Sequence, residues 1–237
     1  MRALVIAHDA YSLPGTVGER LIERGVELDI HIVCPEPRQP EIHTAFPEVG
    51  EHELVVPMGS VWSVYDHATI GNWIGAELEL LRGAHESGHP VLGICFGGQA
   101  LAAALGGHVE SAPEGEIGWC DVRTTRPDVV PEGPWFEWHH DHFTAPPGAE
   151  IVAENDAALQ TFRLGHSVGT QFHPEVSGDH VSMWFQFATE EYLAEHGVDA
   201  EALLAETYRR EEAARRQANA LVDWFLDEVS GLGARLG

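Results

Sequence analysis

One stretch organises the chain: Gly93-Ile94-Cys95-Phe96-Gly97-Gly98-Gln99. The residues before it, Pro90-Val91-Leu92, are typical of the end of a buried strand, and the alanine-rich run from Gln99 to Leu105 is typical of a tightly packed helix. A reactive side chain between a strand and a helix sits on a sharp turn, and glycines two positions to either side allow that turn to close. The pattern therefore predicts a nucleophile elbow that carries cysteine in place of serine.

The predicted position of Cys95 favours chemistry. The positive end of the helix macrodipole stabilises a thiolate, which is the reactive form of cysteine. The alternative is that Cys95 is a small buried core residue, as free cysteine often is.

A second stretch, Gln171-Phe172-His173-Pro174-Glu175, follows a short apolar run that the proline ends. His173 and Glu175 are two residues apart, so in extended backbone their side chains project to the same side. The carboxylate would then fix the tautomer of the imidazole and stabilise its charged form. Cys95, His173 and Glu175 thus form a predicted nucleophile, base and orienting acid. The alternative is that His173, which precedes a proline, only marks the end of a strand.

These two motifs, in this order, resemble those of the class I glutamine amidotransferases, and most of all the free-standing proteins related to the amidotransferase domain of GMP synthase. The resemblance extends from about Leu54 to Glu175. It implies that the side-chain amide of glutamine is hydrolysed through a γ-glutamyl thioester, with no cofactor and no metal. It also implies that Gln99, four residues after Cys95 on the same helix face, contacts the substrate.

Composition sets the class of protein. The chain has 237 residues and an ordinary hydrophobic fraction of 44%, which suits one α/β domain over residues 1–237. Asp and Glu outnumber Lys and Arg by 38 to 13, which argues against nucleic acid and anionic membranes as partners. The three cysteines form no disulfide or metal-binding pattern, and there is no signal peptide or membrane-spanning run. We therefore expect a cytoplasmic protein.

The order of elements predicts an α/β fold with an open, mostly parallel twisted sheet flanked by helices, which the resemblance identifies as flavodoxin-like. The run 3–7 is a strand buried on both faces, 16–24 a helix and 26–33 an edge strand. Residues 72–82 form a further helix. Residues 114–119 and 122–125 are expected to form a small antiparallel excursion, and 151–153, 159–162 and 167–172 to form strands that lead to His173. A helical extension is expected over about 190–230, with Asp199 as the N-cap of a helix over 200–216, followed by a second over 218–229.

The stretch Leu54-Val55-Val56-Pro57-Met58-Gly59-Ser60 is a strand that runs into a turn at the edge of the sheet where ligands bind. The resemblance assigns one oxyanion-hole amide to Gly59 and the other to Phe96, directly after the nucleophile. The family commonly has two glycines at this turn, and Met58 stands at the first of them.

The densest group of aromatic residues and histidines lies at 135–143. A metal site was considered there, but three histidines within four residues rarely converge on one ion without other ligands. The resemblance instead assigns His139, His140 and Asp141 to a loop that binds the α-amino and α-carboxylate groups of glutamine. The remaining alternative is an aromatic core loop with solvated histidines.

The chain contains no recognisable nucleotide-activating motif, so we expect the ammonia to pass to a separate ATP-dependent synthetase subunit. One alternative is a γ-glutamyl peptidase or hydrolase that uses the same triad on another amide. A second is a non-catalytic regulatory protein, against which the intact triad counts. The arginine and glutamate pairs at 209–216 indicate a salt-bridged surface helix or a face that docks a partner.

Overall fold

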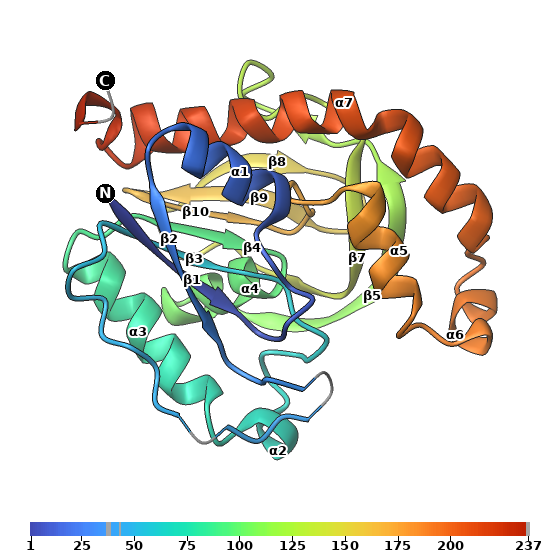
Figure 1. Ribbon diagram of the computed structural model, residues 1–237, viewed down its shortest axis with the longest axis horizontal. Helices are drawn as coiled ribbons and strands as arrows, with labels where there is room; N and C mark the ends of the chain where they lie inside the picture. Colours follow the sequence, from blue (N-terminus) through green and yellow to red (C-terminus); the bar gives the residue numbers. More distant parts are fainter. Residues whose placement is uncertain (37–38, 43, 236–237) are drawn as a thin grey trace.

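An eight-stranded sheet forms the centre of the computed structural model, which describes residues 1–36, 39–42 and 44–235 (Figure 1). The strand order is β2 (Glu27–Ile32), β1 (Arg2–Ala7), β3 (Leu54–Pro57), β4 (Val91–Ile94), β10 (Ser167–Thr170), β9 (Leu159–Leu164), β8 (Glu150–Glu154) and β6 (Arg123–Thr124). The first five strands run parallel, and the pairs from β10 onward are antiparallel. This confirms the predicted α/β fold and the edge position of the second strand.

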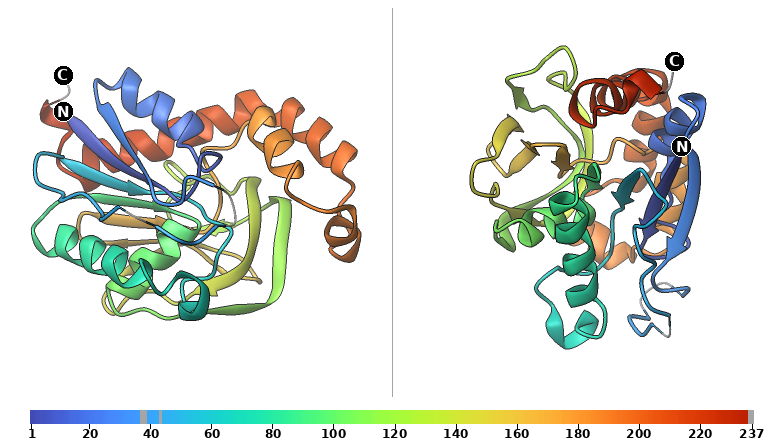
Figure 2. Two further views of the ribbon diagram at one scale, coloured as in Figure 1. Left: turned by 60° about the horizontal axis from the view of Figure 1, so that its bottom comes forward. Right: turned by 90° about the vertical axis from the view of Figure 1, so that its left-hand side faces the viewer.

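The side chains of β1 point alternately to the two faces of the sheet, and both faces are covered by helices. Ala3 and Val5 pack on one side with α1 (Gly15–Glu23) and the end of α7 (Ala200–Trp224), whereas Leu4 and Ile6 pack on the other. The second side is covered by α3 (Ile74–Glu86) and α4 (Phe96–Ala104), as the two views of Figure 2 show. A strand with both faces buried has to be continuously apolar, which is the pattern of residues 3–7.

The antiparallel excursion consists of β5 (Val109–Cys120) and β7 (Trp135–Phe143), which form a separate two-stranded sheet (Figure 1). Two predictions were wrong here. Residues 123–124 pair with β8 at the edge of the main sheet instead of joining the excursion. His139, His140 and Asp141 lie in a strand and not in a loop, because β7 pairs with β5 along its length and alternates its side chains between two faces.

The remaining helices follow the last strand. They are α5 (Gly178–Phe185), α6 (Glu190–Glu195) and α7, which continues into a π-helical turn over Phe225–Val229; α2 (His67–Ile70) precedes α3, and a 3₁₀ turn spans Gly233–Arg235. The Asp199 side chain accepts a hydrogen bond from the Ala202 amide at 3.0 Å, which confirms the predicted N-cap. The expected break after residue 216 is absent, so one helix replaces the two predicted.

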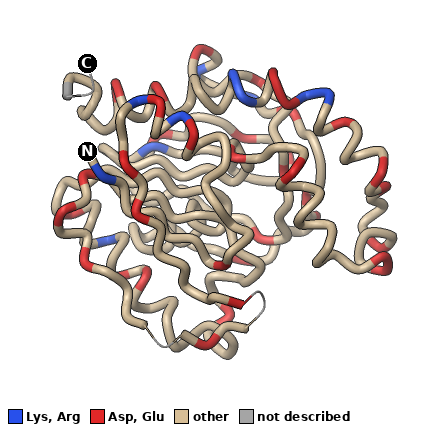
Figure 3. Tube along the Cα trace, viewed as in Figure 1, with Lys and Arg blue, Asp and Glu red and all other residues tan. Residues whose placement is uncertain are grey.

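Helix α7 is held against α1 by charge as well as by apolar contact. Arg20 donates two hydrogen bonds to Asp223, at 3.0 and 2.7 Å, and Arg24 bonds both Asp223 and Asp227. Figure 3 shows the Lys and Arg segments of these helices close to Asp and Glu segments, and Asp and Glu outnumber Lys and Arg along the rest of the trace. None of the described helices is long and apolar enough to cross a membrane.

Candidate active site

Cys95 stands on a strained turn between β4 and α4. Its backbone has φ 51° and ψ −111°, and it is the one described non-glycine residue with positive φ. A left-handed conformation at a non-glycine residue costs on the order of 1–3 kcal/mol and is found mainly at functional sites. Gly97 makes the turn possible, because a Cβ there would overlap the carbonyl group of Pro57 in β3. The predicted elbow is therefore present at the carboxyl edge of the parallel sheet.

His173 follows β10 and faces the elbow. Its Nδ1–H donates to Glu175 Oε1 at 2.7 Å, and its own amide donates to the Phe136 carbonyl at 2.8 Å. The side chains of His173 and Glu175 are 5% and 2% exposed, and the ring packs edge-on against Trp184 with centroids 5.1 Å apart. Glu175 therefore fixes the tautomer that leaves Nε2 available.

The electrostatics couple the ring to the thiol. Burial opposes protonation, but the Glu175 carboxylate and the Cys95 sulfur hold the pKa of His173 well above its ordinary value. Nε2 is buried and makes no hydrogen bond of regular geometry within the described chain. The sulfur itself lies 3.8 Å from Nε2 of Gln171, which donates toward it. The arrangement favours the protonated form of the His173 ring beside the Cys95 sulfur.

The turn after β3 lies beside this pair. A Cβ built on Gly59 would be 3.2 Å from His173 Cε1 and 3.9 Å from Cys95 Cβ, so the loop is in contact with both. Within the described residues, the Gly59 and Phe96 amides donate to no other group. Two free N–H groups next to a nucleophile are suited to an oxyanion.

All nine residues predicted from the sequence line one pocket of about 460 Å³. They are Gly59, Cys95, Phe96, Gln99, His139, His140, Asp141, His173 and Glu175. The rest of the lining is strongly aromatic and includes Trp62, Trp138, Trp184, Phe187 and Tyr192. The pocket lining therefore combines polar groups with large aromatic side chains.

The predicted substrate contacts occupy different positions in that pocket. Gln99 donates through Nε2 to the Asp141 carbonyl at 3.2 Å and to Gln171 Oε1 at 3.3 Å. The Asp141 carboxylate accepts from the Tyr65 hydroxyl at 2.7 Å, and His140 contacts the Tyr192 hydroxyl at 2.5 Å through Nε2. Gln99 and Asp141 are thus fixed by the fold, whereas His140 is exposed at the rim.

Sequence reasoning missed a buried pair behind the Gly59 loop. His8 Nδ1–H donates to the Gly59 carbonyl at 3.0 Å, and Nε2 lies 3.1 Å from both carboxylate oxygens of Glu77. Burial opposes protonation, but Glu77 raises the pKa of His8. The sequence feature that could have indicated this pair is the position of His8. This polar residue directly follows the buried strand Ala3–Ala7, at the edge of the sheet where binding sites form. Gln171 was also quoted within its motif without a role.

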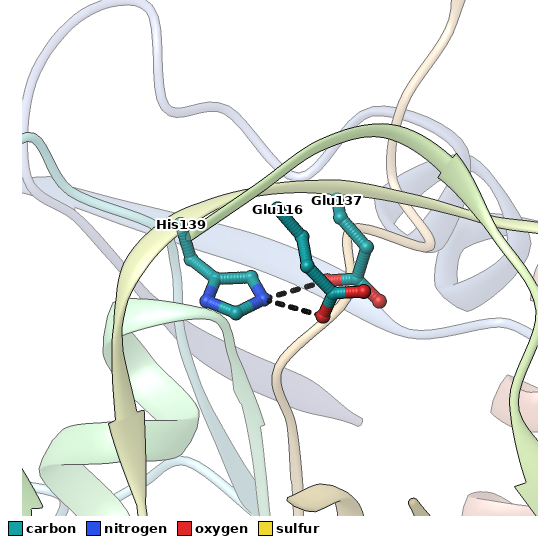
Figure 4. A group of neighbouring side chains, drawn as sticks. All are labelled: Glu116, Glu137 and His139. Carbon is teal, nitrogen blue, oxygen red and sulfur yellow. Dashed lines mark hydrogen bonds and ion pairs between the residues drawn. The ribbon is translucent and has the colours of Figure 1, made fainter. Parts of the chain in front are cut away.

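One further polar cluster lies beneath β7. His139 Nε2 is 3.1 Å from Glu116 Oε2 and 3.4 Å from Glu137 Oε2, as Figure 4 shows. Among the described residues these three could hold a metal ion, since their ligand atoms all lie within 4.8 Å of one another.

Comparisons with known proteins agree on one family. The family model described as "Glutamine amidotransferase class-I" matches residues 7–190. A GMP synthase [glutamine-hydrolyzing] from Thermomicrobium roseum is 32% identical over 173 residues, and one from Stenotrophomonas maltophilia is 38% identical over 107 residues. These matches cover 69% and 39% of this chain but only 30% and 20% of the relatives' own length.

The solved structures show the same relationship over nearly the whole chain. The crystal structure of a glutamine amidotransferase from Thermotoga maritima has a TM-score of 0.82 and 26% identity to this chain, and the match covers 96% of this chain and 99% of that one.

Proposed function

Because this chain belongs to the class I glutamine amidotransferase family, we propose that it hydrolyses the side-chain amide of glutamine to glutamate and ammonia through Cys95, His173 and Glu175. The observation that supports this most is the strained backbone of Cys95, at φ 51°, beside a ring that Glu175 orients at 2.7 Å. A core cysteine has no need of such a conformation.

The first half of the reaction forms the thioester. The Cys95 sulfur attacks the δ-carbonyl carbon while His173 holds the proton that the thiol has lost. Negative charge on the carbonyl oxygen is stabilised by the Gly59 and Phe96 amides, and such a donor is worth about 3–4 kcal/mol in comparable sites. His173 then gives its proton to the leaving nitrogen, so ammonia departs and the γ-glutamyl group stays on sulfur.

The second half releases glutamate. His173, now neutral, takes a proton from water as the water oxygen attacks the thioester carbon. The same two amides stabilise the second oxyanion, and collapse of the intermediate expels the Cys95 sulfur, with His173 left protonated for the next cycle. Glu175 stabilises the imidazolium in both halves, which is the role of the acid in Ser-His-Asp enzymes.

The α-amino and α-carboxylate groups of the substrate are assigned to the part of the pocket bordered by Gln99 and β7. Asp141 supplies a buried carboxylate for an ammonium group, and Tyr65 holds it in place at 2.7 Å. His139 fixes the strand, because its Nδ1–H donates to the Asp141 carbonyl at 2.9 Å. His140 at the rim contacts the entering substrate.

The ammonia is proposed to pass to a separate synthetase. This part rests on the relatives, which are GMP synthases [glutamine-hydrolyzing] and of whose length this chain matches less than a third.

A second candidate, hydrolysis of a larger γ-glutamyl amide, is favoured by the walls of the pocket. A volume of about 460 Å³ lined by three tryptophans is larger and more aromatic than the side chain of glutamine needs. An aromatic amine as the leaving group would fill it.

One experiment tests both candidates. The kcat/KM for glutamine is compared with that for γ-glutamyl anilide, with Cys95→Ala as the control. The main proposal predicts faster turnover of glutamine and no turnover by the variant. Preference for the anilide would support the second candidate, and turnover by Cys95→Ala would refute the mechanism for both.

A further inference from the structure

The cluster beneath β7 is created by strand pairing. Glu116 lies directly opposite His139 in the β5–β7 register, and Glu137 is two residues from His139 on the same face. Three potential ligands therefore converge from two paired strands (Figure 4).

The tautomer of His139 directs a lone pair into the cluster. The Asp141 carbonyl only accepts, so the hydrogen on Nδ1 donates to it at 2.9 Å. In the neutral ring, Nε2 then carries a lone pair that faces Glu116 Oε2 and Glu137 Oε2. A histidine whose other nitrogen is tied to a backbone carbonyl is the common arrangement of metal-binding histidines.

Two buried side chains in this region have oxygens without a hydrogen-bond partner. Glu137 is fully buried and neither of its oxygens forms a hydrogen bond. Gln160 is also fully buried; it donates to Glu116 Oε2 at 3.0 Å while its own Oε1 has no partner. A buried polar atom without a hydrogen bond lowers the stability of the fold by about 1–3 kcal/mol. A bound cation, or waters bound to one, would satisfy these oxygens.

From this geometry we propose that Glu116, Glu137 and His139 bind a zinc ion, at a site separate from the catalytic triad. Zinc bonds of about 2.0–2.2 Å in tetrahedral geometry place neighbouring ligands about 3.3–3.5 Å apart. His139 Nε2 lies 3.1 Å from Glu116 Oε2 and 3.4 Å from Glu137 Oε2. Magnesium and calcium prefer all-oxygen sites, so the imidazole selects against them.

The surroundings fit the same ion. The Cys120 thiol contacts Glu116 from the same strand, β5. A surface cavity of about 410 Å³ reaches Glu116 and is bordered by Glu114 and Asp156, whose negative charges attract cations to the entrance. The Asn155 amide donates to the other Glu116 oxygen at 2.7 Å and so orients that carboxylate.

The test is a calorimetric titration of untagged, chelator-treated protein with Zn²⁺ in a Cys95→Ala background. That background removes the active-site thiol as a competing ligand. We expect one Zn²⁺ per chain, with a Kd that Glu137→Gln weakens at least tenfold. Glu114→Gln, at the mouth of the same cavity, is the matched control and should stay within twofold of the parent. Mg²⁺ should not bind in the micromolar range.

A second measurement keeps the test independent of calorimetry. Zinc at a hundred times its Kd should raise the Tm of the parent by roughly 5–10 °C and that of the Glu137→Gln variant by much less. Gln is isosteric with neutral Glu, so this variant should fold without metal. Equal zinc affinity of Glu137→Gln and the parent, or no binding at micromolar zinc, would overturn the proposal. Neither outcome depends on glutamine turnover.

Discussion

Gly59→Ala places one methyl group against the catalytic ring. The added Cβ would lie 3.2 Å from His173 Cε1 and 3.8 Å from its Nδ1. Carbon atoms in favourable contact are about 3.5–4.0 Å apart, so the ring has to retreat by roughly 0.3–0.5 Å. The His173 ring is held between the Glu175 carboxylate and Trp184. A shift of the ring away from Gly59 therefore changes its alignment with the Cys95 sulfur.

The size of the effect follows from this displacement. A misplacement of about 1 Å in a catalytic site costs about a hundredfold in rate. A few tenths of an ångström should therefore lower kcat/KM about tenfold, which corresponds to about 1.4 kcal/mol of transition-state stabilisation. The Gly59 amide remains in place, so the oxyanion donor is not removed.

The assay is release of ammonia from glutamine, measured beside thermal unfolding. Gly83→Ala is the matched control, because a Cβ at this position of α3 meets nothing within 4 Å. The control should keep full activity and gain about 0.5–1 kcal/mol of stability. Turnover by a folded Gly59→Ala enzyme within twofold of the wild type would refute the contact between this loop and the ring.

Three further changes test other parts of the account. Glu175→Gln should lower kcat for glutamine by about 10²–10⁴ at unchanged fold, because the amide does not stabilise the imidazolium; steady-state kinetics measure this. Gly97→Ala should destabilise the protein by more than about 3 kcal/mol in denaturant unfolding, because its methyl group would overlap the Pro57 carbonyl. Burial opposes protonation of His8, but Glu77 holds the folded-state pKa of His8 above the unfolded value near 6.5. The stabilisation is complete below that pH and is lost as pH rises through the folded pKa, so the stability gap between wild type and His8→Asn should narrow as unfolding is measured at increasing pH.

The parts of the fold that local pattern determines were predictable. The continuous apolar run 3–7 and the glycines around Cys95 specify a buried strand and a turn almost without reference to the rest of the chain. His139, His140 and Asp141 were expected to form a loop, whereas they lie in β7, whose partner β5 is more than a dozen residues away and pairs across a bulge between Ser111 and Glu116. Register of this kind is set by tertiary packing.

The same limit applies to the site. The nine pocket residues were found through two motifs and a family resemblance, and the structure brings all of them to one cavity. The cluster under β7 was not predicted because only the neighbouring histidines were considered as metal ligands. Glu116 joins His139 through cross-strand pairing, and Glu137 becomes a neighbour only because strand residues two apart share a face. No spacing in the sequence indicates the first of these contacts.

The central claim is that Cys95 is an activated nucleophile beside His173, and covalent labelling tests it most directly. The protein is treated with a diazo ketone analogue of glutamine, and the modified residue is located by peptide mass spectrometry. The account predicts one label per chain on Cys95, none on Cys34 or Cys120, and much slower labelling in His173→Asn. Labelling of another cysteine, or an unchanged rate in the His173 variant, would contradict it.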